Sequence, residues 1–538
     1  MARLPHLLIS LALPLIASLV FTGCGGGVKP PQIDLMAVPG YEMQGDTVKE
    51  RLAAGLSPAE AAGSGGLEAE ELVLTLREVV VSVLRNNRDI RVAFQGPVQA
   101  QAGILEAQSD YDPEAFAEWE HSRNSNPYNK GGRSSNSRHY NDTERIGLRQ
   151  TSPTGATVSA YREWTSGAEW DPGQAKARGH GGAYVLEMTQ PILNGLGNRE
   201  TRANIAISRV QYDRSEEELR RVMINTTADA LETYWNLALA REDIRIYQET
   251  LGMAETLLAR EISRQREGLS TELDVERARE AVATRTVNLI NARDQEHMQQ
   301  ERMKLILNKG GMPVGSRTRV RAAEALDTPP PQVRLDLERS IEAALTNRPE
   351  MRQADLAIRA GEVREKYARH NLLPRLDLVG RVRDNDKSAD RNVPGYDVDT
   401  LGHDWAVGMM FSVPLGNMKA RAGLQRAESE LRQALDEMKS ARDIIVAETK
   451  IAVKSLELVA QEIPQSRRAV EAAVKVVEGE WARFELNQVG NRDLLQAQDL
   501  LAVSERNRIQ NLVRYNNAMI SLLAAEGTLL AHLGISLN

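Results

Sequence analysis

The chain has 538 residues, and its 67 Lys and Arg against 74 Asp and Glu give a net charge of −7. This balance argues against a nucleic-acid binder, because contact with phosphates normally leaves a basic surface. Only 4% of the residues are aromatic, and long stretches of Ala, Leu, Glu, Arg and Gln lack Gly and Pro. That composition favours extended helices packed side by side over several compact domains.

Residues 1–23 are predicted to be a lipoprotein signal peptide. One charge, Arg3, precedes an apolar stretch that ends in Phe21-Thr22-Gly23-Cys24. This ending resembles a bacterial lipobox, which implies that Cys24, the only cysteine, carries lipid. By the same resemblance, Gly25 implies sorting to the outer membrane. The alternative is an ordinary signal peptide with an incidental cysteine.

Residues 24–70 are rich in Gly and Pro and are predicted to be a flexible linker that follows the lipid anchor. The first of two repeats, residues 71–309, begins with a helix whose apolar residues recur at helical spacing. A β segment follows at 113–190, with strands expected at about 114–121, 144–151, 156–164 and 183–190. Either all four strands join one sheet, or two of them form an accessory hairpin over its rim.

The first repeat continues with a long helix over 191–267 and a return helix over 270–308. An equatorial linker over 310–334 leads to the second repeat, residues 335–534. There the same order recurs as a helix, two strands at 375–382 and 404–413, a long helix over 415–489 and a return helix over 493–534. The matching order indicates a duplication that builds a pseudo-symmetric wall.

The strands of the second repeat alternate strictly between apolar and polar residues, for example at Leu376, Leu378 and Val382. One lipid-facing and one water-facing side is typical of a membrane strand, although strands of a soluble sandwich alternate equally well. The flanking long helices leave no second sheet to cover the apolar side. After the signal peptide no run of 18 apolar residues occurs, so a membrane crossing requires a closed β-barrel.

The helix lengths add up. Each long helix has about 76 residues, or roughly 110 Å, and a return helix of about 40 residues plus a first helix of about 36 has the same length. We therefore expect the end of the first repeat and the start of the second, joined by the linker, to stack end to end beside one long helix.

This lipobox and duplicated helix, strand and hairpin order resembles the TolC-like outer-membrane efflux channel family, in particular its lipid-anchored members. The resemblance implies a mainly α fold with β, in which long coiled-coil-like helices form a periplasmic α-barrel. It also implies a homotrimer whose strands close one shared transmembrane β-barrel. The implied partners are outer-membrane lipid, a periplasmic adaptor protein and, through the adaptor, an inner-membrane pump.

The same resemblance makes the two hairpin turns the adaptor-docking tips, Gly268, Leu269 and Ser270 in the first repeat and Gly490, Asn491 and Arg492 in the second. Glu267 and Asp493 depart from the family pattern at these turns. Both glycines are also expected to act as left-handed helix terminators.

In this family an acidic residue at the position of Asp274 pairs with a basic residue at that of Arg492 and latches the closed tube. The alternative is that Asp274 only completes a capping box with Thr271, a spacing that Asp493 and Gln496 repeat. One turn deeper, the resemblance places the pore entrance at Gln496 and Asp499. Gln496 removes one ring of charge there, while Asp499 keeps the other or lies on a solvated helix face.

No catalytic function is expected. His121, His139, His180 and His403 lie in the presumed outer segments but share no metal-ligand spacing, and no catalytic triad or phosphate-binding loop occurs. The sequence therefore predicts neither enzyme activity nor a cofactor. It predicts a passive, gated exit duct for efflux or type I secretion. The alternative is a periplasmic coiled-coil adaptor or scaffold lipoprotein.

Overall fold

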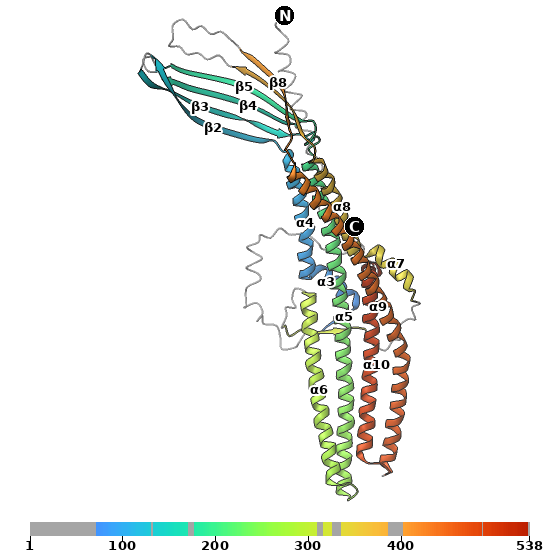
Figure 1. Ribbon diagram of the computed structural model, residues 1–538. Coiled ribbons are helices and arrows are strands. Elements are labelled where there is room, and N and C mark those ends of the chain that lie inside the picture. The colour runs from blue at the N-terminus through green and yellow to red at the C-terminus, as the bar shows by residue number, and fades with distance from the viewer. Residues whose placement is uncertain are drawn as a thin grey trace.

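Two helices of 68 residues each run along the molecule and set its length. The computed structural model describes residues 71–130, 133–170, 177–308, 316–324, 326, 335–385, 402–486 and 488–535. The long helices are α5 (Arg199–Arg266) and α9 (Met418–Glu485), each roughly 100 Å at 1.5 Å per residue. A sheet lies at one end of the rod and two helical hairpins at the other (Figure 1). The mainly helical fold with two repeats that the sequence predicts is thus confirmed.

Both long helices begin later than their predicted starts at 191 and 415. Asn198 and Asn417 precede them with left-handed φ values of 42° and 43°, and Gly197 and Gly416 also have positive φ. A left-handed residue cannot continue a right-handed helix, so in both repeats the chain turns here before the long helix starts. This turn separates the sheet from the helices.

The first helix of each repeat is broken in two, whereas the sequence analysis expects one. The pieces are α3 (Leu76–Asn86) and α4 (Arg88–Gln108) in the first repeat, and α7 (Leu337–Asn347) and α8 (Pro349–His370) in the second. Asn87 is extended, and its side-chain oxygen accepts hydrogen bonds from the Asp89 and Ile90 amides at 2.8 and 3.3 Å. A polar N-cap and, in the second repeat, a proline at the first helical position each start a new helix.

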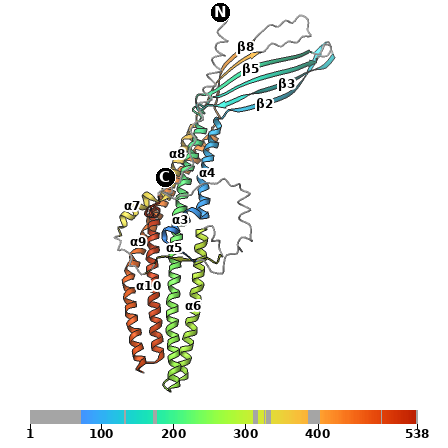
Figure 2. The same cartoon turned by 180° about the vertical axis from the view of Figure 1, so that it is seen from behind.

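The return helices stack within their own repeat, so the expected stacking of the first repeat on the second is wrong. The end of α6 (Glu272–Leu307) meets the break between α3 and α4, where Asn87 Nδ2 donates to Ile306 O and Asn308 Nδ2 donates to Asn86 O, both at 2.9 Å. The end of α10 (Asn491–Ala525) reaches the break between α7 and α8, beside Asn347. Figures 1 and 2 show α4 and α6 in line beside α5.

The core lies halfway along the rod, around the break between α3 and α4. Val79 and Val83 of α3, Met223 of α5, and Met303 and Leu307 of α6 are almost fully buried there. A short parallel pair, β1 (Glu71–Leu74) and β6 (Arg319–Ala322), packs against the same cluster. The short helix α11 (Leu529–His532) contributes Leu529 and Leu530.

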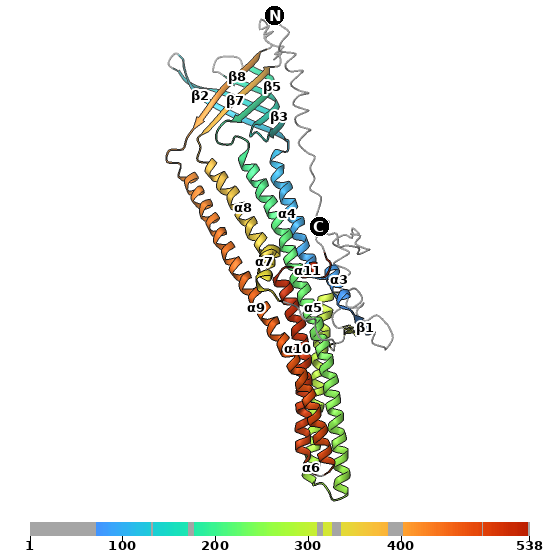
Figure 3. The same cartoon turned by 90° about the vertical axis from the view of Figure 1, so that its right-hand side faces the viewer.

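All six remaining strands belong to one antiparallel sheet with the order β2-β3-β4-β5-β7-β8. This answers the question that the sequence leaves open, because the first two strands are full members of the sheet. Five of the strands are also longer than expected, whereas β8 has its expected length and begins one residue earlier. The bounds are β2 (Glu114–Lys130), β3 (Arg133–Thr151), β4 (Thr157–Trp170), β5 (Ala177–Pro191), β7 (Arg375–Asn385) and β8 (His403–Ser412). Figure 3 shows the sheet standing above the ends of α4, α5, α8 and α9.

Among the described helices, none contains a stretch that is both long and apolar enough to pass through a lipid bilayer.

Tyr234 joins the two-stranded sheet to α5 and supplies a test of the core. Its buried hydroxyl donates to Leu74 O at 3.1 Å and accepts from the Ala323 and Glu324 amides at 3.0 and 3.2 Å. Tyr234→Phe removes the hydrogen-bond partner of the Glu324 amide, whereas Leu74 O and the Ala323 amide keep a 2.9 Å hydrogen bond to each other. An orphaned polar group costs about 1–3 kcal/mol when it is buried. We expect a lower melting temperature by circular dichroism.

The control is Tyr247→Phe on the same helix, because among the described residues no hydrogen bond involves the Tyr247 hydroxyl. Equal melting temperatures for both variants and the parent protein would show that the Tyr234 hydroxyl does not stabilise the core around β1, β6 and α5.

Candidate gate at the hairpin tips

The first tip is a tight helix termination built on Gly268. Its φ is +77°, and the Leu269 amide donates to Arg264 O at 2.8 Å while the Gly268 amide donates to Gln265 O at 3.0 Å. This pair of hydrogen bonds is the Schellman motif, which needs a left-handed residue at the glycine position. The left-handed terminator predicted for Gly268 is confirmed, and Leu269 projects into solvent with 58% of its surface exposed.

Asp274 caps its own helix. The Thr271 side chain accepts from the Asp274 amide at 3.3 Å, and the Thr271 amide donates to Asp274 Oδ2 at 3.3 Å, which completes the predicted capping box. Arg277, one turn on, lies 3.4 Å from the other carboxylate oxygen. Among the ion pairs of the described chain, none joins Asp274 to Arg492, whose side chain is exposed.

The second tip differs from the expectation in two ways. Gly490 is the N-cap of α10 and has an extended conformation with φ −82°, so its predicted role as a left-handed terminator is wrong. Asp493 lies inside the first turn of α10, so the capping box expected for Asp493 and Gln496 is also wrong. The helix begins two residues earlier than predicted because Asn491 already has helical geometry.

Asn491 joins the two tips. Its side chain is 2% exposed, and Nδ2 donates to the backbone oxygen of Asp274 at 2.7 Å. The hydrogen bond links the first turn of α10 to the first turn of α6. Asn491 is therefore a structural contact between the hairpins, and its side chain is not available to a docking partner in this conformation.

Phe484 fills the space between the hairpins just above the tips. It comes from the end of α9, is 2% exposed, and packs against Leu257 of α5 and Leu494 of α10. The guanidinium of Arg264 lies 4.8 Å from the Phe484 ring centroid and donates to Phe484 O at 3.3 Å. A buried aromatic ring with a cation over its face stabilises contact between the two hairpins.

One turn deeper, a buried arginine bridges three helices. Arg285 of α6 has 6% of its side chain exposed, and its guanidinium donates to Thr250 O of α5 at 3.1 Å. It also donates to Gln498 Oε1 at 2.8 Å and to Asp499 Oδ1 at 2.9 Å, both on α10. Because a buried cation requires compensation, this network favours the arrangement in which the two hairpins touch.

Arg285 is not among the predicted site residues, although the chain carries a signal for it. The buried face of α6 around Arg285 is made of small and apolar residues, with Ala281 four residues before Arg285 and Leu289 four residues after it. A charged residue at such a core position indicates a buried partner. The identity of that partner depends on how α10 is rotated, which the spacing alone does not determine.

The residues predicted for the pore entrance share one face of α10. Arg492, Gln496, Asp499 and Val503 are all exposed and follow one another at intervals of four, three and four residues, so they form one stripe. Asp499 is 68% exposed at its side chain yet also receives the Arg285 hydrogen bond. The positive charge of Arg285, which is not among the predicted site residues, thus partly compensates the negative charge of Asp499.

Farther from the tips, Arg506 of α10 pairs with Asp243 of α5. The distances are 3.1 Å from Nε to Oδ1 and 3.4 Å from Nη2 to Oδ2. Burial raises the pKa of Asp243, and the hydrogen bond from Arg506 opposes that rise. The interface between the two hairpins therefore contains polar contacts at three levels. From the tips upward they are made by Asn491, Arg285 and Arg506.

Two histidines of the outer segments, His121 and His403, pair with acids. His121 lies 2.6 Å from Asp142, and His403 lies 2.9 Å from Asp384. The side chain of His180 lies outside the described residues. In the described part of the chain, no three His, Cys, Asp or Glu side chains are grouped as metal ligands would be.

Comparison with known proteins gives a family and a fold. The model of the family described as outer membrane efflux protein matches residues 155–309 and 340–528. Three of the similar solved structures, each covering most of the chain, are described as outer-membrane or transmembrane channels. No curated protein sequence matches.

The first similar structure is the outer-membrane channel OprN, with 18% identity over 84% of this chain and 90% of that one, and a TM-score of 0.62. CusC has 17% identity over 86% and 95%, with a TM-score of 0.63. The CmeC channel of Campylobacter jejuni has 16% identity over 87% and 91%, with a TM-score of 0.63. At these identities the structures show a shared fold.

Arg285 can be tested through local opening of the hairpins. Arg285→Met removes hydrogen bonds from a charged group to Thr250, Gln498 and Asp499, and such bonds are worth about 1.5–3 kcal/mol. Local opening should become roughly 10- to 100-fold more frequent. Hydrogen exchange would detect this opening as faster exchange of the backbone amides in the first turns of α6 and α10, near the tips.

The matched control is Arg279→Met on the same helix. Arg279 is 58% exposed at its side chain and pairs only with Glu276 one turn away among its described ion pairs. If both variants exchange at the parental rate, Arg285 does not hold the hairpins together.

Proposed function

The chain belongs to the outer membrane efflux protein family, and from this premise we propose that it works as a homotrimeric, passive exit duct from the periplasm to the exterior. The observation that carries the proposal is the arrangement of the parts. An amphipathic sheet lies at one end of two helices that are each roughly 100 Å long, and both hairpins point to the opposite end (Figure 1). Such a rod can join the outer membrane to a partner deep in the periplasm.

The exposed apolar side chains on the helices support assembly of several copies. Val287 and Ile290 of α6 and Ile444 and Ile451 of α9 have more than half of their surface exposed in the single chain. Exposed apolar patches on long helices mark contact surfaces. In the proposed trimer these faces pack against the neighbouring copies and close the helical tube.

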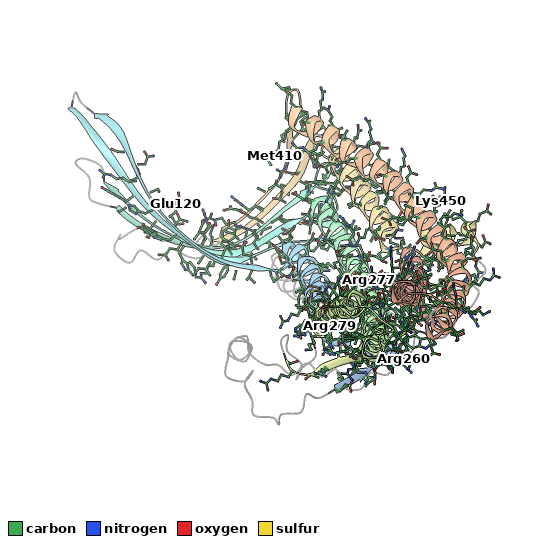
Figure 4. The ribbon with its side chains drawn as sticks, turned by 90° about the horizontal axis from the view of Figure 1, so that it is seen from below. Glu120, Arg260, Arg277, Arg279, Met410 and Lys450 are labelled. Atoms are coloured by element: carbon green, nitrogen blue, oxygen red, sulfur yellow. The ribbon has the colours of Figure 1, made fainter. Side chains whose placement is uncertain are left out.

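The tips are the proposed docking site for a periplasmic adaptor that couples the duct to an inner-membrane pump. Leu269 and Arg492 are exposed there, with Gly268 and Ser270 beside Leu269 and Gly490 beside Arg492. Figure 4, seen from below, shows the helices that carry Arg260, Arg277 and Arg279 gathered at this end, while the sheet extends to one side. The buried side chain of Asn491 contributes by holding the turn in shape.

We also propose that Asp274 pairs with Arg492 of a neighbouring copy and biases the duct toward the closed state. The cap at Thr271 uses Asp274 Oδ2, and the exposed Arg492 lies outside the ion pairs of the described single chain. Exposed pairs contribute about 0–1 kcal/mol each, so three copies supply at most about 3. Reversing a 1:99 equilibrium takes roughly 5.5 kcal/mol, so the latch acts together with the Phe484 and Arg285 contacts.

The exit-duct proposal is tested by conductance. The purified protein should be trimeric and should add channels to a planar lipid bilayer. A monomeric protein that adds no conductance would overturn the proposal.

Two substitutions separate the latch from the cap. Asp274→Asn keeps a side-chain oxygen for capping but removes the charge, and Arg492→Gln removes the partner. Each should raise the ratio of open to closed channels, by at most roughly 100-fold, in single-channel recordings. Arg277→Gln, which removes only the neighbour of Asp274 on its own helix, is the control. If all three variants behave like the parent, Asp274 is a cap alone.

Cys24 lies outside the described residues, and its lipidation is proposed from the lipobox-like Phe21-Thr22-Gly23-Cys24. Several acyl chains on one cysteine hold a protein firmly to a membrane, because each buried CH₂ contributes about 0.8 kcal/mol. Cells fed a palmitate analogue should label the parent protein and not the Cys24→Ser variant. Equal labelling of both would place the lipid elsewhere.

A further inference from the structure

Each edge strand of the six-stranded sheet has one free edge, since no further strand pairs with it among the described residues. β8 forms one edge, and all ten of its residues are exposed, while β2 forms the other edge. An edge strand presents a row of backbone N–H and C=O groups that need a partner, above all in lipid. The question is which edges meet when copies of the chain assemble.

The sheet has one mainly apolar face that continues across all six strands, with Glu144 of β3 and Arg162 of β4 as charged residues on it. The cross-strand register places Trp119 of β2, Ile146 of β3, Leu186 of β5, Val382 of β7 and Trp405 of β8 on the same side. Trp119 and Trp405, at the opposite edges, are 70% and 77% exposed. Within the described residues no helix covers this face, and Figure 4 shows the sheet curving away from the helices. The first two strands thus share the lipid-type face of the others.

The opposite face is charged, and its ion pairs tie the first two strands to the rest. Arg145 of β3 lies 2.8 Å from Glu163 of β4 and 3.6 Å from Glu118 of β2. Arg383 of β7 reaches across β5 to Glu163 at 3.0 Å. Ala183, the residue of β5 opposite Glu163, is fully buried and small enough to leave room for that contact. One glutamate therefore connects β3 with β7.

The pairing between β3 and β4 is longer than every other pairing in the sheet except that between β2 and β3. It runs from Arg138 opposite Trp170 to Thr151 opposite Thr157 without interruption. If β2 and β3 were only an accessory hairpin, β4 would have to be free to pair with a neighbouring copy. In the structure, β3 pairs with this edge of β4 along its whole length.

We propose that β8 of each copy pairs with β2 of the next, so that three copies close a barrel of eighteen strands, three times the six of one chain. This inference rests on the proposed trimer and specifies how its membrane end is built. β7 and β8, with 11 and 10 residues, have the length that a tilted membrane strand needs. A barrel of 16–18 strands leaves a water-filled channel, lined here by the charged face.

Paired cysteines test which strands meet. Ala117→Cys on the apolar face of β2 is combined in turn with Val407→Cys, Met409→Cys or Phe411→Cys on the same face of β8, which covers neighbouring registers. Oxidation of outer membranes, or treatment with a short bis-maleimide, should convert one or more of these double variants to covalent dimers and trimers. Each single variant should give none.

The matched control pairs the same β8 cysteines with Ala160→Cys on β4, another exposed alanine of the apolar face. Covalent products from the β4 pairs in place of the β2 pairs would overturn the proposal and indicate a barrel of twelve strands. A strand count in an image of the purified trimer gives the same decision without substitutions. Absence of any oligomer would instead refute the proposed trimeric duct.

Discussion

A helix that ends inside a packed wall must still find partners for its last backbone groups, and the tube depends on how this is done beside α5. There α6 ends where α3 gives way to α4, and two asparagines exchange hydrogen bonds across the junction. Asn87 Nδ2 donates to Ile306 O, and Asn308 Nδ2 donates to Asn86 O. Because backbone carbonyls at helix ends otherwise lack partners, this exchange lets two separate helices continue one another.

The contact between the hairpins follows from the same requirement applied to side chains. Buried polar groups are costly unless they are paired, and Arg285, Asn491 and Asp243 all find their partners on the other hairpin. Separation of the hairpins exposes these groups to water, which can replace some of the lost hydrogen bonds. Apolar packing around Phe484 has no such replacement, so its exposure to water opposes separation of the hairpins.

The sequence predicts the parts of this molecule better than their contacts. Local patterns specify the strands, the hairpins and the capping box of Thr271 with Asp274, because each signal lies within a few residues. The order of stacking is different. α4 and α8 have 21 and 22 residues, so length alone does not decide which of them continues α6. The partners of Arg285 depend likewise on the rotation of α10, which arises only when the hairpins pack.

The breaks at Asn87 and Pro349 were within reach of sequence reasoning, since an asparagine cap and a first-position proline are both local signals. Gly490 was harder. The two tips occupy the same place in each repeat, yet Gly268 is left-handed and Gly490 is extended. Duplicated sequences therefore do not imply duplicated backbone conformations, and the two turns present different surfaces.

The strands of the sheet are unequal in a way that shapes the outer mouth. β3 has 19 residues and β8 has 10, a difference of nine, or about 30 Å of strand. In a threefold assembly with its short strands level with the membrane, three β2–β3 projections rise above the described ends of β7 and β8. These projections are the part of each copy's described sheet that meets the surroundings of the cell at the greatest height.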